Sequence, residues 1–527
     1  MSRVLCGFAG LALPSLCAYA QAPGPIAQDA PDGSVAGEAS TGPDVLVGRL
    51  AGEASYGGEE GVSAFSFGFS VCNLGDAPVE YVAFTNEHPI ITHNLYRLSD
   101  GRFEQIGMSW VFHEFAALAF DSCNAGCLNP GTLQLLGTGC STPNSASIAG
   151  VASILSPRSL IDAHTGDFPY SYSGVCEVCG PLDRRLQVHD SDLDPALNVG
   201  ALYFVEGQVV APDDSAAGNQ NNNASYRPMS LVQPRCDFNL QTLCDSDLDC
   251  TGPGRCANNI AATCLSESDC PGLGRCEINE MDECNVDADC PVAGEACIKC
   301  RPDVCEWPPL CSTTLPLDGF CVRLTGQTER EQSGIRAWRV QDPSVVETEI
   351  EAPGAGFLIL AAKATDLGNG WWRYEYALQN VNLDRSVRSF AIPRPHGAAV
   401  DNVGFHDVDY HSGDTVDGTD WPAIVTDASI SWSTSAYEVN PDANALRWGT
   451  LYNFRFDSRA CPGQAIVSLE LFKPGAPTSI TAATIGPELR SEPVPTVSEW
   501  GVAIMILLML GAGTAIVRRQ TGFTRAA

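Results

Sequence analysis

The sequence predicts a mainly β protein with two β-sandwich domains, a disulfide-rich module between them or inserted in one, and one C-terminal transmembrane helix. Three observations lead to this prediction: alternating apolar segments separated by turn residues, a cysteine pattern with a 20-residue period, and an uncharged apolar segment near the C-terminus. Short alternating segments without a long helical pattern are typical of strands that pack face to face.

The first sandwich is predicted over residues 43–235. The segment AFSFGFSV at 64–71 places every second, large apolar side chain on one side, which is the period of a half-buried strand. ALYFVEGQVV at 201–210 fits another strand. The preceding segment 21–42 is rich in Ala, Gly, Pro and Asp and predicts a flexible leader.

The second sandwich, immunoglobulin-like in general character, is predicted over residues 350–487. Its β-like segments lie at 356–362, 371–380, 451–457 and 465–472. Within 371–380, Trp372, Tyr374, Tyr376 and Leu378 share one face of the strand, and Arg373, Glu375 and Gln379 share the other.

The module between the sandwiches covers residues 236–311 and contains three similar units that begin at Cys244, Cys264 and Cys284. Each unit has three cysteines, so if all are oxidised some disulfides join neighbouring units. The module has little apolar content, and small domains of this kind depend on disulfides for stability. The disulfide candidates are Cys236, Cys244, Cys250, Cys256, Cys264, Cys270, Cys276, Cys284, Cys290, Cys297, Cys300, Cys305, Cys311 and Cys321.

Zinc is the alternative partner for these cysteines. Inside the repeats, five or more residues separate successive cysteines, whereas zinc modules favour two to four. The spacing therefore favours disulfides, which form in exported proteins.

Two strand-like segments, at 225–232 and 320–327, lie on either side of the module. We expect them to pair in the first domain, so that 312–345 completes this domain and the module is an insertion at a hairpin tip. The alternative is a module that separates two independent domains.

Both ends of the chain predict export. Residues 1–20 carry Arg3, then an apolar stretch, then Ala18-Tyr19-Ala20, in the order of a secretory signal peptide. Residues 500–519 predict a transmembrane helix with a basic stop, because the eighteen residues from Trp500 to Val517 carry no charge and would rise about 27 Å as a helix.

The segment VPTVSEWG, residues 494–501, begins in the linker 488–499 and ends at the start of the apolar segment. It resembles the IPTL-type C-terminal sorting signal of bacteria. The matching positions are Val494, Pro495, Thr496, Val497, Trp500 and Gly501, followed after the apolar segment by Arg518 and Arg519. The resemblance implies that an exosortase-type membrane transpeptidase recognises and removes the tail.

The formal net charge of −33 disfavours a nucleic-acid partner, because such a surface repels phosphate groups. The densest polar segment, 405–421, holds the metal candidates His406, Asp407, Asp409, His411 and Asp414. Oxygen-rich loops of this kind bind Ca²⁺, and an acidic, turn-rich surface loop is the alternative interpretation.

A second candidate metal site consists of His88, His93 and His113. Neutral histidine is a common ligand of zinc and copper, but the spacing of these three residues matches no known site. No G-x-S-x-G, S-x-x-K, H-E-x-x-H or Walker-type segment occurs in the sequence.

Taken together, these features predict an exported bacterial protein of the cell envelope or cell surface, or one released after C-terminal cleavage. Its expected role is structural, adhesive or ligand-binding, with envelope glycan, matrix or another surface protein as partner. The alternative is an extracellular hydrolase or metal-dependent enzyme that uses one of the two histidine sets. The two differ in geometry, because an enzyme needs a concave pocket where such groups converge.

Overall fold

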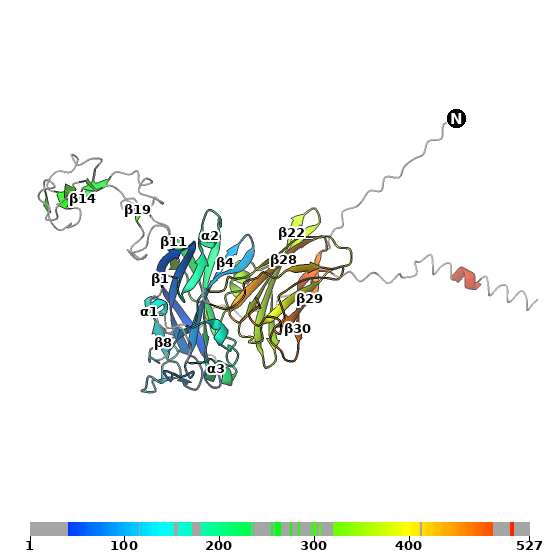
Figure 1. The fold of residues 1–527 in the computed structure, drawn as a ribbon, viewed down its shortest axis with the longest axis horizontal. Helices are drawn as coiled ribbons and strands as arrows, with labels where there is room; N and C mark the ends of the chain where they lie inside the picture. Colours follow the sequence, from blue (N-terminus) through cyan, green and yellow to red (C-terminus); the bar gives the residue numbers. More distant parts are fainter. Residues whose placement is uncertain are drawn as a thin grey trace, which may run out of the picture.

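The computed structural model describes residues 40–114, 116–151, 156–170, 180, 182–232, 235–236, 254–256, 259–264, 274–276, 283–284, 297–298, 300–301, 305–306, 320–411, 414–488 and 506–510. Within this part, two β domains lie side by side (Figure 1). The predicted signal peptide, most of the leader and the sorting-motif residues lie outside the described residues.

The strands of the first domain are β1 (Val45–Glu59), β2 (Val62–Asn73), β3 (Val79–Glu80), β4 (Ile90–Ser99), β5 (Arg102–Met108), β6 (Phe112–His113), β7 (Leu135–Leu136), β8 (Ser141–Asn144), β9 (Leu186–His189), β10 (Leu202–Val210), β11 (Ala224–Val232) and β20 (Cys321–Leu324). Its short helices are α1 (Ala146–Val151), the 3₁₀ helix η1 (Arg158–Leu160), α2 (Asp190–Leu193) and α3 (Pro212–Ala217).

The main described sheet of this domain has ten strands, eight of which follow the order β1-β2-β9-β5-β4-β10-β11-β20. It curls, so that β1 contacts β10, β11 and β20 across a core that contains Phe65, Phe67 and Phe69 of β2. The large apolar side chains of β2 face the core as predicted, but the strand is buried on both faces and not half-buried. One curled sheet, rather than two separate sheets, encloses this core.

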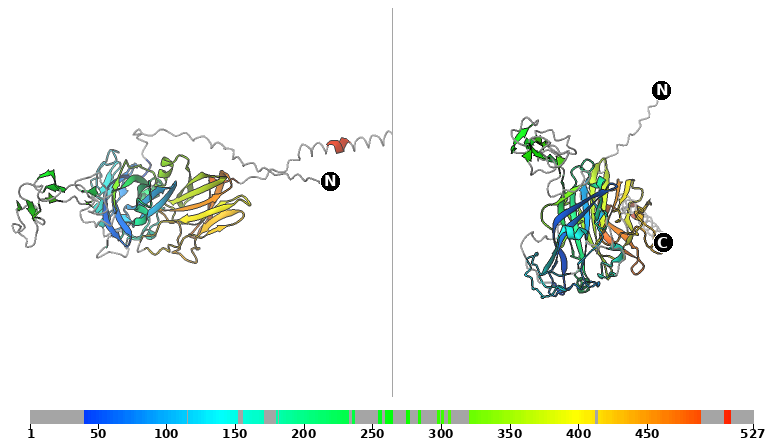
Figure 2. Two further views of the ribbon diagram at one scale, coloured as in Figure 1. Left: turned by 90° about the horizontal axis from the view of Figure 1, so that it is seen from above. Right: turned by 60° about the vertical axis from the view of Figure 1, so that its left-hand side comes forward.

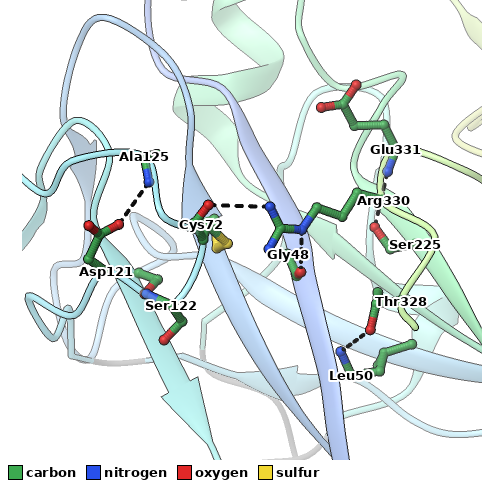
Figure 3. The surroundings of a disulfide bond; sticks show 12 residues. Gly48, Leu50, Cys72, Asp121, Ser122, Ala125, Ser225, Thr328, Arg330 and Glu331 are labelled. Carbon is green, nitrogen blue, oxygen red and sulfur yellow. Dashed lines mark hydrogen bonds between the residues drawn. A yellow bond between two sulfur atoms is a disulfide. The ribbon is translucent and has the colours of Figure 1, made fainter. Parts of the chain in front are cut away.

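Side chains join the two ends of this sheet. Arg330 Nε donates to the carbonyl of Gly48 at 2.7 Å, and the backbone N–H of Leu50 donates to Thr328 Oγ1 at 3.0 Å (Figure 3). Arg227 Nη1 donates to the carbonyl of Leu50 at 2.5 Å. These bonds satisfy edge groups of β1 that would otherwise be open to another strand.

The second domain begins with α4 (Arg336–Gln341), and its strands are β21 (Val346–Ala352), β22 (Gly356–Gly368), β23 (Trp371–Asn380), β24 (Val387–Pro393), β25 (Val400–His406), β26 (Ala423–Val425), β27 (Ser429–Ser433), β28 (Thr450–Ser458), β29 (Pro462–Leu471) and β30 (Ser479–Pro487). They form two five-stranded sheets in the described residues, with orders β21-β22-β23-β28-β25 and β26-β27-β24-β29-β30. Tyr374, Tyr376 and Leu378 of β23 face the core between these sheets. A mainly β protein with sandwich packing is therefore confirmed.

The outer face of the sheet that contains β22 is covered by the first domain. Phe357, Ile359 and Ala361 of β22 share an apolar cluster with Phe204 of β10 and with Trp338 of α4. The left view of Figure 2 shows the two domains side by side. Since β22 is buried on both faces, the domains form a continuous packed body.

The segments predicted to pair across the cysteine module do so. β11 and β20 are antiparallel neighbours, with Met229 opposite Leu324 and Val232 opposite Cys321. The chain between residues 232 and 321 therefore leaves and re-enters the first domain at adjacent strands of one sheet.

Eight short strands of the module are described: β12 (Arg235–Cys236), β13 (Gly254–Cys256), β14 (Asn259–Cys264), β15 (Gly274–Cys276), β16 (Glu283–Cys284), β17 (Cys297–Ile298), β18 (Cys300–Arg301) and β19 (Cys305–Glu306). Their backbone register places three pairs of cysteines opposite each other: Cys236 and Cys305, Cys256 and Cys300, and Cys276 and Cys297.

The predicted transmembrane helix is wrong. No helix in the part of the chain that the structure describes is long and apolar enough to cross a membrane. Within 500–519, the described residues 506–510 form five helical residues.

Candidate functional site

The residues predicted as a metal site at 406–414 turn toward separate partners. Asp407 accepts a hydrogen bond from Asn444, and Asp409 lies 2.8 Å from His189 Nε2. His411 Nε2 lies 2.9 Å from the carbonyl oxygen of Arg185 in the first domain. Among the described residues, no group of three or more His, Cys, Asp or Glu side chains could hold a metal ion.

The second predicted set also does not converge on one point. The rings of His88 and His113 are 5.4 Å apart, whereas His93 packs between Phe67 and Phe69 at 6.0 and 5.7 Å. Burial lowers the pKa of His93 and of His113 to about 3 each. These histidines are therefore neutral side chains of the first domain's interior.

The structure contains two disulfides that are absent from the predicted set, Cys72–Cys123 and Cys127–Cys140. The first joins β2 to the segment around Cys123, and the second closes the segment between Cys127 and Cys140. Gly48 of β1 packs directly on the first disulfide. In the sequence, only the predicted export indicated that these four cysteines form disulfides, because they belong to no repeat. Cys321, which was predicted, is disulfide-bonded, and so is Cys461. For the other predicted cysteines, the side chains lie outside the described part of the chain.

The domain junction holds a buried polar network that the sequence did not indicate. Glu206 of β10 is 0% exposed and accepts hydrogen bonds from Asn94 (2.7 Å) and Tyr96 (2.9 Å) of β4. It also accepts from the backbone N–H of Gly334 (2.5 Å) and from Gln379 of β23 (2.9 Å). Four donors from both domains thus surround one carboxylate, which fixes how the domains meet.

Arg158 of η1 is the buried cation of this junction. It is 3% exposed, and its Nε and Nη2 donate to the carbonyls of Ser109 and His93, both at 2.6 Å. Its Nη1 donates to the carbonyl of Gly449 in the second domain at 3.0 Å. Burial lowers the pKa of this guanidinium to about 10, so it remains charged at neutral pH.

A small cavity of about 20 Å³, enough for one water molecule, lies beside Arg158 where the two domains meet. The first domain supplies Arg158, Ser159, Met108 and Ile161 to its wall. The second domain supplies Asp384, Tyr410, Asp414, Arg447, Trp448 and Lys473, among others. Asp414 is the one predicted metal candidate that lines it, and it accepts from Ser159 Oγ at 2.8 Å.

Charged groups gather around this cavity, and most of them already have partners in the protein. Three cations and two carboxylates line it, and it contains no His or Cys from the described residues. Lys473 Nζ pairs with Asp384 at 2.5 Å, and Arg447 Nη2 donates to the carbonyls of Pro441 and Ala443 at 2.9 and 3.2 Å. A water molecule in this cavity can therefore meet both donors and acceptors.

No family model and no curated protein matches this chain. Among solved structures, the Actinomyces fimbrial adhesin FimA is similar with 16% identity and a TM-score of 0.13, covering 30% of this chain and 53% of the FimA chain. The chain thus spans about half the length of that adhesin. The N-terminal domain of the Streptococcus gordonii adhesin Sgo0707 is similar with 7% identity and a TM-score of 0.16, covering 84% of this chain and 97% of that one. Neither TM-score indicates a shared overall fold.

Proposed function

We propose that this chain is an exported bacterial cell-surface protein with an adhesive, structural or ligand-binding role. The observation that carries the proposal is the pair of disulfides inside the first domain, Cys72–Cys123 and Cys127–Cys140. Disulfides of this kind persist in oxidising surroundings outside the cytosol. The net charge of −33 suits a protein that must stay soluble and separate outside the cell.

The contacts at the domain junction support a structural or binding role. Arg102 of β5 and Glu375 of β23 form two hydrogen bonds across it, Nε to Oε2 and Nη2 to Oε1, both at 3.1 Å. With the apolar cluster around Trp338 and the network around Glu206, these bonds hold the two domains in one orientation. A fixed orientation presents the surfaces of both domains in one arrangement before any partner arrives, which lowers the entropic cost of binding.

The cysteine module is proposed to be an inserted, disulfide-bonded unit displayed from the first domain. The adjacent exit and re-entry strands, β11 and β20, support the insertion. The three opposed cysteine pairs in the backbone register support cross-strand bonding, because antiparallel neighbours bring their Cα atoms within disulfide range.

The C-terminal motif is proposed to be a processing signal. The IPTL-type pattern is matched by Pro495, Thr496, Trp500 and Gly501, and Arg518 and Arg519 follow later in the sequence. An exosortase-type enzyme would act on this motif and leave the two β domains on the surface or in the medium.

The experiment is surface labelling of intact cells of the source organism, followed by intact mass and peptide mapping without reduction. We expect the protein to react with a membrane-impermeant label, to contain the Cys72–Cys123 peptide pair and to lack residues beyond the sorting motif. A protein that is shielded from the label in intact cells, with reduced Cys72 and Cys123, would overturn the proposal.

A further inference from the structure

We propose that a second copy of this chain docks on the outer face of the sheet β26-β27-β24-β29-β30, sheet against sheet. This inference rests on the proposed surface role and names a partner for it. The inner face of this sheet packs on the core of the second domain. The first domain covers the outer face of the companion sheet, through Phe357, Ile359 and Ala361. Within the described part of the second domain, the outer face of β26-β27-β24-β29-β30 is thus the sheet face left open to solvent.

One row of uncharged side chains crosses this open face. Its members are cross-strand neighbours, one from each strand, and such neighbours share a face of the sheet. They are Ile424, Ser431, Ala391, Ser468 and Thr481. In β27, β24 and β29 the residues before and after the row are buried, so the row itself points outward.

Two isoleucines project from the open face. Ile424 of the row is 56% exposed, and Ile466 of β29, which lies opposite Ala483 of β30, is 63% exposed. The serine and alanine side chains of the row are too small to cover them. Contact with another protein surface would remove both isoleucines from water, which is favourable.

The charge of the face favours a second copy as the partner. The chain has a net charge of −33, so two copies repel each other through most of their surfaces. Glu470, two residues along β29 from Ser468, brings a carboxylate to the open face, and Arg388 Nη2 pairs with it at 2.5 Å. Two copies that meet through this face therefore bring little net charge together.

The position of the aromatic side chains disfavours a glycan on the same face. Sugar rings pack on exposed aromatic side chains, whereas Phe390 of β24 and Trp432 of β27 face the core. A two-fold axis places the same patch on both sides of an interface, so a flat, uncharged face can be complementary to itself.

The size of the face predicts a weak dimer. Five strands at about 4.8 Å spacing give a width of about 24 Å, and strands of about seven residues give a similar length. Two copies would then bury roughly 1,150 Å² in total, at the lower limit of stable interfaces. Such an interface forms mainly where the local concentration is high, as for molecules held together on one surface.

The test is sedimentation equilibrium of the purified full-length protein, with disulfides intact, from about 5 to about 500 μM at pH 7. We expect a monomer–dimer equilibrium with a Kd on the order of 100 μM in about 0.5 M NaCl. In about 0.05 M NaCl the Kd should be at least about fivefold higher, because the repulsion between the acidic copies is screened less.

Ile466→Glu and Ser431→Glu are the site variants, and Val340→Glu is their matched control. Each site variant adds a carboxylate to the open face on a different strand, and should weaken dimerisation at least about tenfold. Val340 is 66% exposed on α4, outside this face, so Val340→Glu adds the same charge and should leave the Kd unchanged. All three variants keep the C-terminal apolar segment, so a difference between them cannot come from that segment. Thermal unfolding of each variant monitors whether it folds.

The inference is overturned if the wild-type protein stays monomeric at about 500 μM in high salt, or if both folded site variants dimerise like the wild type. It is also overturned if Val340→Glu weakens dimerisation as much as they do. A surface-labelled, disulfide-bonded protein that stays monomeric would contradict this inference alone. A protein that dimerises through this face but is found in the cytosol would contradict the proposed function alone.

Discussion

Gln379 of the second domain donates a hydrogen bond to Glu206 of the first, with 2.9 Å between Nε2 and Oε2. The same carboxylate accepts from Asn94, Tyr96 and the backbone N–H of Gly334. A buried carboxylate that accepts from four donors at fixed positions tolerates little displacement, because each lost bond leaves a buried donor without a partner. The junction is therefore held by directional bonds as well as by apolar packing.

Glu206→Gln tests this network. The substitution replaces one acceptor oxygen with an NH₂ group that faces two donors, so we expect the free energy of unfolding to fall by about 2–4 kcal/mol. Denaturant titration followed by fluorescence measures the loss. Glu349→Gln is the control, because the Glu349 side chain is 57% exposed and pairs with Arg336 at the surface, where removal costs about 0–1 kcal/mol. Equal stability of Glu206→Gln and the wild type would contradict this view of the junction.

Gly48 tests the packing of β1 on the first disulfide. A Cβ added at residue 48 would collide with the Sγ atoms of Cys72 and Cys123, so Gly48→Ala forces the bridge or the strand to move. We expect a loss of about 1–3 kcal/mol in the oxidised protein, as for overpacking in a core. In a Cys72→Ala, Cys123→Ala background the same substitution should cost much less, because the sulfur atoms are gone. A double-mutant cycle measures the coupling, and a coupling energy near zero would contradict the contact.

Much of the fold could be predicted from local patterns. The segments at 64–71, 201–210 and 371–380 are strands. At 64–71 and 371–380 the signal was a two-residue period of large apolar side chains, which favours a strand over a helix. The pairing of 225–232 with 320–327 also followed from two β-like segments that flank a self-contained module. The transmembrane helix predicted at 500–519 was wrong, because no helix in the described part of the chain is long and apolar enough to cross a membrane.

The junction could not be predicted for a physical reason. In β23, Glu375 and Gln379 lie on the face opposite the tyrosines. Polar side chains at every second position of a strand normally indicate a face that is exposed to solvent. Both are buried, at 5% and 1% exposure, because the first domain supplies Arg102 and Glu206 as their partners. Those partners lie more than 170 residues away in sequence, at 273 and 173 residues. A periodic pattern indicates which residues share a face, but not whether water or another domain covers it.

The stability of the protein should fall as the pH rises from about 4.5 to about 8. Burial raises the pKa of Glu114 from 4.5 to about 8, against the opposing hydrogen bond from Asn144. Between these values the folded protein holds a proton that the unfolded chain releases. The free energy of unfolding therefore falls by about 1.4 kcal/mol for each pH unit of increase in this window. Glu114→Gln does not titrate and should flatten this part of the profile, as measured by denaturant titration from pH 5 to 9.

Asp214→Asn is the matched variant for this profile. Burial raises the pKa of Asp214 to about 7, so this substitution should flatten the profile below pH 7 and leave the decline between pH 7 and 8 in place. A profile of Glu114→Gln that declines as steeply as the wild type over pH 7–8 would exclude Glu114 as the source.

Trp338 tests whether the two domains unfold as one unit. It is fully buried in the apolar cluster of the junction, on α4, where it shares that cluster with Phe204 of the first domain and Ile359 of the second. Trp338→Ala should cost about 3–5 kcal/mol through the cavity it leaves. Because that loss falls on the contact between the domains, we expect one calorimetric transition in the wild type and two in the variant. Val340→Ala on the same helix removes a side chain that is 66% exposed and should leave the single transition unchanged. If Trp338→Ala still unfolds in one transition at the wild-type temperature, the apolar cluster does not couple the domains, and the polar bonds of Glu206 and Arg158 alone would have to hold the junction together.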